Sequence, residues 1–387
     1  MEGVYHAKRA RVLNILDRRA GLWIIAVEVE GKEEKAVHFP LFWGQIAAGD
    51  EVFLNVTAAQ LGLGSGGYHF VAGIAGQTGE ATEGEGLQQV NGKQGLERGQ
   101  GHIMKLRYTP LQFARMSVEE PASPYHQLLA KGSDAGGLPV IIGELHSMLA
   151  PVVIALRERS PAARIAYIMP DSGALPLKFS ELVQELSRRY GLTATITTGH
   201  AFGGELEAVN VYSALLAASK VLRADYVVMA MGPGIVGTGT RLGFSGLDQA
   251  DWLNAAEKLG CLPLLIPRIS QADTRERHRG LSHHSRTVLE CTFARAYLAV
   301  DPAWFEPGGA ISSAGDDLEW LQGLPGHKIW YRRWNDELES ALQEGADLLH
   351  SMGRTYQDDP IFFRAPALAA ELAVDLKEGI PVGADEC

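Results

Sequence analysis

The sequence predicts a two-domain protein in which a small β-barrel-like domain precedes a larger, Rossmann-like α/β domain with a mainly parallel sheet. Residues 9–74 hold short runs of β-branched and aromatic residues between turn signals, which is typical of small all-β domains. From residue 138, continuous apolar runs alternate with segments of helical period, which indicates crossover connections and a sheet covered on both faces. With 387 residues, 46% of them hydrophobic, the chain can bury both cores.

The N-terminal domain is expected to end near residue 110 and to contain five strands. They cover residues 12–16, 22–29, 36–39, 52–56 and 68–74. Strands this short favour a closed barrel or a sandwich, which leaves no long edge exposed. Residues 61–68, LGLGSGGY, are interpreted as a hairpin connection, because no helix pattern follows as a phosphate loop requires.

A change of composition marks the end of this domain. Residues 77–101 are rich in Gly, Gln and Glu and have few large apolar side chains, so this insertion is predicted to be mobile. A strand resumes over residues 102–108. Residues 111–137, punctuated by proline, are predicted to bridge to the α/β domain at residues 138–387.

The α/β domain is predicted from five apolar runs and two helical patterns. The runs cover residues 138–142, 164–169, 192–198, 226–231 and 262–266. The residues that share a helical face are Phe179, Leu182, Val183, Leu186 and Tyr190 in one segment and Leu206, Val209, Tyr212, Leu216 and Ser219 in the next. Residues 293–300 and 327–332 are expected to extend the sheet, and helices near 336–352 and 366–377 to pack against it.

The charge of the chain argues against nucleic acid as a partner. A formal net charge of −11 repels a phosphate backbone over most of the surface. The dense basic cluster of Arg275, Arg277, Arg279 and Arg286 lies among histidines, which suits a small anion better than a duplex. A small anionic metabolite is therefore the expected partner, and homo-oligomerisation is left open.

The cysteines and the first residues predict a cytoplasmic protein. Cys261, Cys291 and Cys387 are scattered and lack a CxxC spacing, so neither a disulfide framework nor a zinc knuckle is expected. The first twelve residues do not follow the pattern of a signal peptide. The apolar runs are shorter than the span of about 20 residues that a membrane requires, so no membrane segment is expected.

Polar residues follow each of the five predicted strands of the α/β domain. Ligands of open parallel sheets bind at the carboxyl ends of the strands, so this edge is the expected site. Turn geometry alone accounts for part of the glycine content there.

The fourth predicted strand is followed by MGPGIVGTGTRLGFSG, residues 231–246, which we interpret as an anion site. Closely spaced glycines let backbone N–H groups approach a phosphate or a carboxylate. The alternative is a flexible surface loop, and no nucleotide motif is matched. The anion-binding candidates, with one arginine from the basic cluster, are Gly232, Gly234, Gly237, Thr238, Gly239, Thr240, Arg241 and Arg279.

The second cluster, RHRGLSHHSR at residues 277–286, holds two adjacent histidines. Ser282 is a plausible N-cap for the helix that follows, so a capped, basic helix start is the alternative to a site. Because neighbouring helical residues diverge, at most one of His283 and His284 is expected to point into a given site. Either histidine has the chemistry for proton transfer or metal ligation.

Catalysis is expected from side chains at three strand ends. The catalytic candidates are Asp171, His200, His283 and His284. Asp171, His200 and one of the two adjacent histidines are expected to converge in one pocket beside the glycine loop and to act as acid–base groups. A metal is the minority alternative, with His146, Asp171, His200 and Glu205 as candidate ligands, because no HExxH or comparable spacing occurs. Ser172 ranks lower as a nucleophile because it lacks a GxSxG elbow.

Several motifs together resemble an uncharacterised bacterial family, domain of unknown function 3866. They are LGLGSGGYHF, PDSGALP, GHAFGGE, MGPGIVGTGTRLGFSG and GLSHHS. The resemblance runs over most of the chain and implies a bacterial cytoplasmic protein, but no activity, cofactor or catalytic residue. Residues 77–101 depart from the family pattern as an insertion.

The sequence is compatible with two functions of different classes. The first is an enzyme that binds a small anionic metabolite at the strand ends and catalyses hydrolysis or group transfer. The second is a non-enzymatic binding or regulatory module whose N-terminal β domain contacts a protein or a nucleic acid. The sequence assigns no cofactor and no substrate, and the position of the polar pocket distinguishes the two functions.

Overall fold

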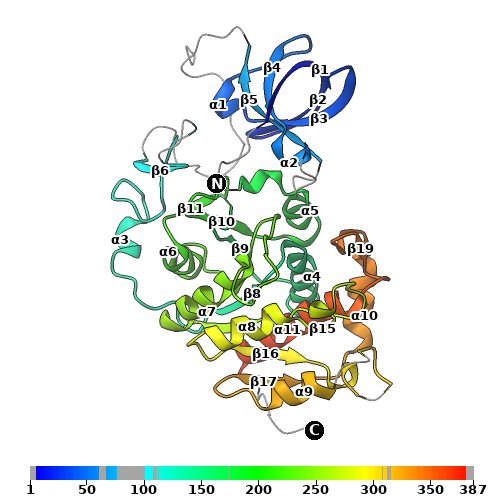
Figure 1. Cartoon of the computed structure of the whole chain (residues 1–387). Coiled ribbons are helices and arrows are strands. Elements are labelled where there is room, and N and C mark those ends of the chain that lie inside the picture. Colours follow the sequence, from blue (N-terminus) through cyan, green and yellow to red (C-terminus); the bar gives the residue numbers. More distant parts are fainter. Residues whose placement is uncertain are drawn as a thin grey trace. The chain divides into compact units, whose positions relative to one another are not determined.

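The computed structural model in Figure 1 describes residues 6–60, 67–75, 101–107, 111, 113–173, 175–306, 308–311 and 315–380. The chain divides into two compact units, residues 1–95 and 96–387. The predicted fold class is confirmed, because the first unit contains a closed barrel and the second an eight-stranded sheet. Most of the predicted hairpin at 61–68 and of the predicted insertion at 77–101 lies outside the described residues. The predicted boundary near 110 and the bridge at 111–137 stay predictions.

Five strands close the barrel of the first unit, in the order β1-β2-β3-β5-β4. They are β1 (Ala7–Arg19), β2 (Leu22–Val29), β3 (Lys32–His38), β4 (Glu51–Asn55) and β5 (His69–Ile74), with short helices α1 (Pro40–Trp43) and α2 (Thr57–Gln60) between them. All five predicted strands are present. Two irregularities in the pairing of β1 with β2 bend β1, so that it also pairs with β4 and closes the barrel.

The second unit is built on a fully parallel sheet. In spatial order its strands are β11 (Leu206–Ala208), β10 (Ala194–Thr198), β9 (Ile165–Met169), β12 (Tyr226–Ala230), β8 (Pro139–Gly143), β13 (Leu262–Leu265), β16 (Tyr297–Val300) and β17 (Lys328–Tyr331). The five predicted apolar runs form β8, β9, β10, β12 and β13. Every residue of β8, β9, β10 and β12 is buried, because helices cover both faces of the sheet.

The helices form two groups. One group packs together around α4 (Leu149–Arg159) and comprises α5 (Glu181–Tyr190), α10 (Asp336–Glu344) and α11 (Pro360–Glu378). The other comprises α6 (Val211–Leu216), α7 (Gln249–Lys258) and α8 (His283–Cys291), while α9 (Gly315–Gln322) connects β16 to β17. In Figure 1, α4 and α5 lie on one side of the strands and α6 and α7 on the other. No helix among the described residues is long and apolar enough to span a membrane.

The strand order reverses between β8 and β12, which are neighbours in the sheet. From β8 the chain crosses to β9, beyond β12, whereas from β12 it crosses in the opposite direction to β13, beyond β8. Right-handed crossovers in opposite directions place their helices on opposite faces. A crevice therefore opens at the carboxyl ends of β8 and β12, which is where doubly wound sheets bind ligands.

One predicted helix is partly wrong. Leu206 starts strand β11, where it pairs with Ile196, instead of opening a helix. The helix α6 begins only after Asn210, whose side chain accepts a hydrogen bond from the N–H of Ser213. As a result the predicted helical face is not the buried one, since Tyr212 is 43% exposed.

Short elements complete the second unit. The predicted strand at 102–108 is limited to β6 (Ile103–Lys105), which pairs with β7 (Phe113–Arg115). Helix α3 (His126–Leu129) follows, and two small antiparallel pairs stand apart from the main sheet: β14 (Ile269–Ser270) with β15 (Gly280–Leu281), and β18 (His350–Ser351) with β19 (Arg354–Thr355).

Candidate functional site

A pocket of about 510 Å³ lies at the carboxyl ends of β8 and β12. Its walls come from the loops after these two strands, from α5 and from the segment around β18. The lining residues are Glu144, Leu145, His146, Ser147, Glu181, Leu182, Glu185, Gly232, Pro233, Gly234, Ile235, Asp347, Leu348, His350, Ser351 and Met352. The pocket is thus at the position where the topology of the sheet predicts a ligand.

Glu144, one of the pocket residues, belongs to a buried charge network. Arg268, which follows the neighbouring strand β13, lies 3.3 Å from both carboxylate oxygens of Glu144 and 3.4 Å from Asp273. All three side chains are at most 2% exposed. Burial alone would raise the pKa of Glu144, but the hydrogen bond from His284 and the charge of Arg268 lower it below its usual value. Glu144 is therefore an ionised carboxylate at neutral pH.

His284 is held in one orientation by two contacts. Its Nδ1 forms a hydrogen bond with Glu144, and its ring stacks on Phe244 with the centroids 3.7 Å apart and the planes parallel within 1°. When a carboxylate accepts a hydrogen bond from Nδ1–H, the imidazole is in the tautomer whose free lone pair lies on Nε2. This nitrogen is then available to take a proton or to bind a cation.

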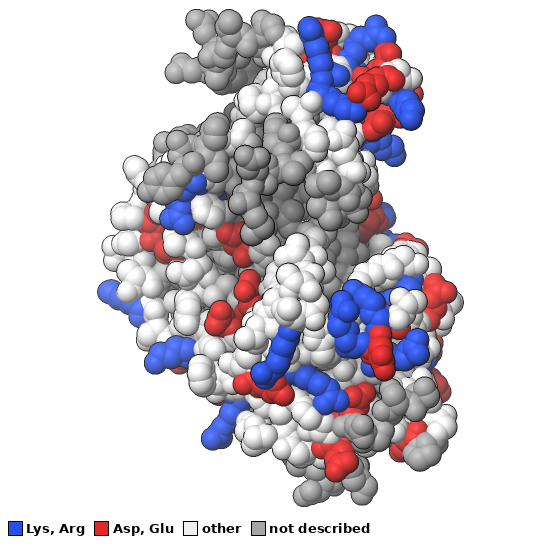
Figure 2. Space-filling model, viewed as in Figure 1, with Lys and Arg blue, Asp and Glu red and all other residues white. Residues whose placement is uncertain are grey.

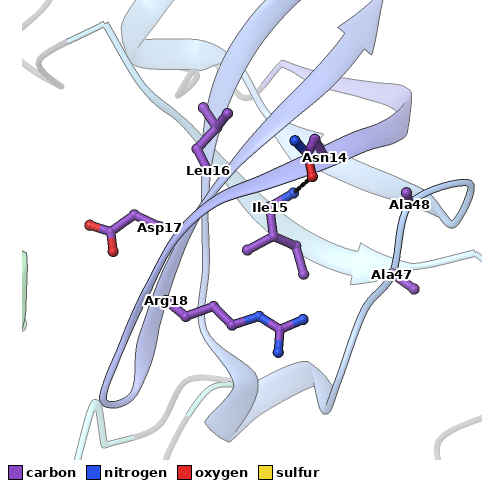
Figure 3. Close-up of a pocket in the computed structure, with 7 residues that line it drawn as sticks. All are labelled: Asn14, Ile15, Leu16, Asp17, Arg18, Ala47 and Ala48. Atoms are coloured by element: carbon purple, nitrogen blue, oxygen red, sulfur yellow. Dashed lines mark hydrogen bonds between the residues drawn. The ribbon is translucent and has the colours of Figure 1, made fainter.

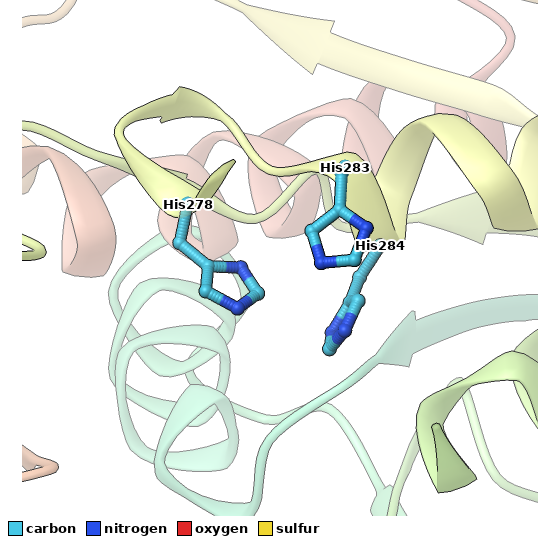
Figure 4. Close-up of side chains that lie close together, drawn as sticks. All are labelled: His278, His283 and His284. Carbon is cyan, nitrogen blue, oxygen red and sulfur yellow. The ribbon is translucent and has the colours of Figure 1, made fainter. Parts of the chain in front are cut away.

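Three histidines converge at the start of α8. One ring nitrogen each of His278, His283 and His284 lies within 4.8 Å of the others, and Figure 4 shows the three rings grouped around a common space. The expectation that at most one of His283 and His284 faces a given site is therefore wrong. Both occupy the first turn of α8, directly after the cap Ser282, where no preceding turn restricts their rotamers.

Two histidines of this cluster, His278 and His283, have lowered pKa values. Burial, followed by the charges of Arg268 and Arg275, lowers the pKa of His278 to about 3. Burial also lowers the pKa of His283. Neutral imidazole is the form that ligates metals.

His146 plays a structural part. Tyr167 donates its hydroxyl hydrogen to the carbonyl of Ala230 and therefore accepts from Nδ1 of His146, at 3.2 Å. The Nε2 of His146 pairs at 2.6 Å with Ser180, whose hydroxyl caps α5 by accepting from Val183. Burial lowers the pKa of His146 to about 4. Because both ring nitrogens are engaged, His146 has none left for a metal.

Asp171 contacts His200, but its carboxylate binds the backbone N–H of the histidine and not the imidazole ring. The carboxylate of Asp171 accepts from the N–H of His200 at 2.7 Å, while Nδ1 of the ring accepts from the N–H of Leu106. Buried Lys105 fixes the same loop by donating to the carbonyls of Gly199 and Ala201. Asp171 therefore holds the loop rather than the imidazole in these contacts.

His200 and the histidine cluster belong to different parts of the sheet edge. His200 follows β10, whereas Glu144, the partner of His284, follows β8, and two strands lie between these strands. Three strand spacings correspond to about 14 Å. The four predicted catalytic residues thus form two groups, and their shared catalytic role stays a prediction.

The other predicted ligands do not gather around a metal position. Glu205 is exposed. Among the residues that the structure describes, His278, His283 and His284 form the one group of three close histidine, cysteine or acidic ligands. Ser172 carries a buried hydroxyl without a hydrogen-bond partner in the described part of the chain.

The conformation of the predicted anion loop explains why glycine occurs at three of its positions. Gly234 and Gly239 adopt φ of 109° and 78°, which side chains rarely tolerate. A Cβ on Gly232 would lie 2.7 Å from Leu175. The first part of the loop lines the pocket, whereas residues 236–242 are exposed and folded on themselves, with Thr238 donating to the carbonyl of Gly243. Anion binding by this loop stays a prediction.

The arginines provide positive charge beside the pocket. Arg241 pairs with Glu290, but Arg277 and Arg279 are exposed and have no ion pair among the described residues. Arg268 and Arg275 both contact the sulfur of Met352, which lines the pocket. Figure 2 shows Lys and Arg gathered over the region where Figure 1 draws β15 and β19.

A second pocket, of about 400 Å³, lies on the barrel. Residues 14–18 of β1 line it together with Ala47 and Ala48. Ile15 and Arg18 point to one side of the strand, toward Ala47, and Asp17 points to the other (Figure 3). The lining contains no buried ionisable group, so this pocket offers a binding surface but not the chemistry found at the strand ends.

Comparison with known proteins gives one match. The family described as Protein of unknown function (DUF3866) matches residues 35–370. No curated protein and no solved structure matches the chain.

Proposed function

Since the chain belongs to the DUF3866 family, whose description assigns no activity, we propose a function from the site itself: an enzyme that binds a small anionic molecule in the pocket between β8 and β12 and catalyses its hydrolysis or a group transfer. The proposal includes a bacterial, cytoplasmic setting, which the motif resemblance and the scattered cysteines support.

The observation that carries the proposal is the pairing of Glu144 with His284 at the wall of the pocket. Glu144 lines the pocket and holds Nδ1 of His284. An ionised, buried carboxylate that orients an imidazole is an arrangement used in general acid–base catalysis. A stacked, buried ring also loses little freedom when it reacts.

The roles of the residues follow from their chemistry. His284 takes a proton through Nε2 from a water molecule or a substrate hydroxyl, and Glu144 stabilises the imidazolium that forms. Arg268 keeps Glu144 ionised. Arg275, which reaches the pocket wall at Met352, and the exposed Arg277 and Arg279 supply positive charge for a phosphate or carboxylate group.

The negative lining of the pocket limits where an anion fits. Glu185 and Asp347 pair with Arg188 and Arg189, so their charges are partly balanced. At the Met352 end of the pocket, Arg268 and Arg275 reach the wall, and the carboxylate that pairs with Arg275, that of Asp273, does not line the pocket. The anionic group of the ligand is therefore expected at that end, with the rest of the molecule along the apolar wall of Leu145, Leu182 and Leu348.

A thermal-shift screen with phosphorylated and carboxylated metabolites tests this proposal. A ligand that binds the folded state raises the melting temperature. Leu348→Trp fills the proposed pocket, and Ala47→Trp is the matched control in the barrel pocket. We expect ligands that stabilise the wild type and the Ala47→Trp protein but not the Leu348→Trp protein. The opposite pattern would transfer the site to the barrel and contradict the proposal.

A further inference from the structure

We propose that His278, His283 and His284 bind one divalent transition-metal ion, with zinc as the best match to three imidazole ligands. The inference rests on the proposed function and changes one step of it: with a metal ion bound, Nε2 of His284 is a ligand, and the ion instead of this nitrogen activates the water for hydrolysis. The evidence for the ion is the geometry of the histidines themselves, and its test does not depend on identifying a substrate.

The first argument is the state of the ring nitrogens. His278 pairs through Nδ1 with the hydroxyl of Ser282 at 2.7 Å, and His284 pairs through Nδ1 with Glu144. Neither Nε2 has a hydrogen bond within the described part of the chain. The Nε2 of His283 is buried and equally without a partner. Three Nε2 atoms are therefore without a hydrogen bond in the described part of the chain, and that of His283 is also buried, which is rare for an unpaired polar atom.

The second argument is that the rings are already held as metal ligands usually are. A ligating histidine normally donates its other N–H to a carboxylate, a hydroxyl or a carbonyl, which fixes the tautomer and the direction of the ring. Glu144 provides this contact for His284, and Ser282 provides it for His278. Ser282 is itself fixed as the cap of α8.

The third argument is distance. The ring centroids lie 4.3 to 5.0 Å apart, and the nearest ligand atoms lie within 4.8 Å of one another. A tetrahedral zinc ion with Zn–N bonds of about 2.0–2.1 Å holds its ligand nitrogens about 3.4 Å apart. Metal binding therefore requires the nitrogens to approach one another from within 4.8 Å to about 3.4 Å, and His283 is the least buried of the three rings.

Charge and ligand number define the type of site. Glu144, which contacts both His284 and Arg268, places a carboxylate beside the histidines and offsets part of the charge of the incoming cation. Three nitrogen ligands leave a fourth position open, as in catalytic rather than structural zinc sites. An ion there would lower the pKa of bound water, which loses a proton to solvent. The hydroxide would then add to the phosphorus or carbonyl carbon of the substrate, the bond from that atom to the leaving oxygen would break, and the leaving group would take up a proton from solvent.

The test is metal titration of the untagged, full-length protein after removal of metals with EDTA. Co²⁺ binding is followed by its visible absorption, and Zn²⁺ binding by calorimetry. We expect one ion per chain. His283→Ala should abolish this binding without lowering the melting temperature of the metal-free protein, because Nε2 of His283 has no partner to lose. His200→Ala is the matched control and should bind as the wild type does.

Two further measurements keep the test decisive. Glu144→Gln should retain one ion per chain but bind it about 10–100-fold more weakly, as expected when the partner of a ligand is lost. X-ray absorption of the zinc-loaded wild type should count three imidazole ligands, whether or not any variant folds. Absence of zinc binding by the wild type, or unchanged binding by His283→Ala, would overturn the inference. Neither result would affect the ligand shifts that test the proposed function.

Discussion

Replacement of Arg268 by methionine should destabilise the second unit by about 2–4 kcal/mol. Arg268 is 2% exposed and lies between two buried carboxylates. Removing one partner of a buried ion pair typically costs about 3–5 kcal/mol, because the other charge is left uncompensated. Asp273 keeps Arg275 at 2.8 Å, so the loss falls mainly on Glu144. Methionine recovers about 1 kcal/mol, since the buried and unpartnered Nε of Arg268 disappears.

Urea unfolding followed by tryptophan fluorescence measures this loss. The matched control is Arg241→Met, which breaks an ion pair with Glu290 whose side chains are 66% and 38% exposed. An exposed pair contributes at most about 1 kcal/mol. Glu144→Gln in the Arg268→Met background should recover part of the lost stability, because no charge then remains unpaired on Glu144. Equal stability of Arg268→Met and Arg241→Met would refute the role given to the buried network.

Three further predictions concern the second unit away from the pocket. Burial raises the pKa of Asp225, but hydrogen bonds from two basic side chains lower it to about 2. Asp225→Asn should therefore lower the free energy of unfolding by up to about 2 kcal/mol at pH 7. In unfolding curves, the difference in free energy between this variant and the wild type should vanish as the pH falls from about 4 to 2. Gly345→Ala places a Cβ 2.5 Å from Ile154 and 2.8 Å from the hydroxyl of Tyr190, so a melting curve should report a loss of about 1–3 kcal/mol. Burial raises the pKa of Cys261 to about 12, and in a variant with no other cysteine this thiol should react with a disulfide reagent only after denaturation; rapid reaction in the native state would contradict its burial.

The elements that the sequence predicted best are those whose pattern is local and complete. The apolar runs of β8, β9, β10, β12 and β13 are short, continuous and followed by polar loops, which only a covered parallel sheet explains. The spacing of Leu206 and Val209, three positions apart, predicts a shared helical face, but an apolar residue at position 206 fits a short edge strand equally well. Only pairing with Ile196 decides between them, and that contact is not local.

The proposed site lies at the edge of the sheet where the sequence predicts one, and His284 is among the predicted catalytic residues, whereas Glu144 and Arg268 are not among the predicted site residues. Glu144 and Arg268 are 124 positions apart, and they meet because β13 returns to the side of β8 after four other strands have been added. Strand order cannot be read from apolar periodicity. His278 was missed because it lies before the helix, and the β14–β15 pair turns it back toward His283. The cluster of basic residues and histidines around the GLSHHS motif was the available signal.

Turnover by the Glu144→Gln protein tests the central claim most directly. The substrates are phosphate and carboxylate compounds that stabilise the wild type, and the measured quantity is kcat at saturating concentration. Glutamine keeps the shape of the side chain but donates where the carboxylate accepts, so His284 would be held in the wrong tautomer. We predict that binding persists and that kcat falls at least about 100-fold, the size of an acid–base contribution. A kcat equal to that of the wild type would show that the pair of Glu144 and His284 is not the catalytic centre.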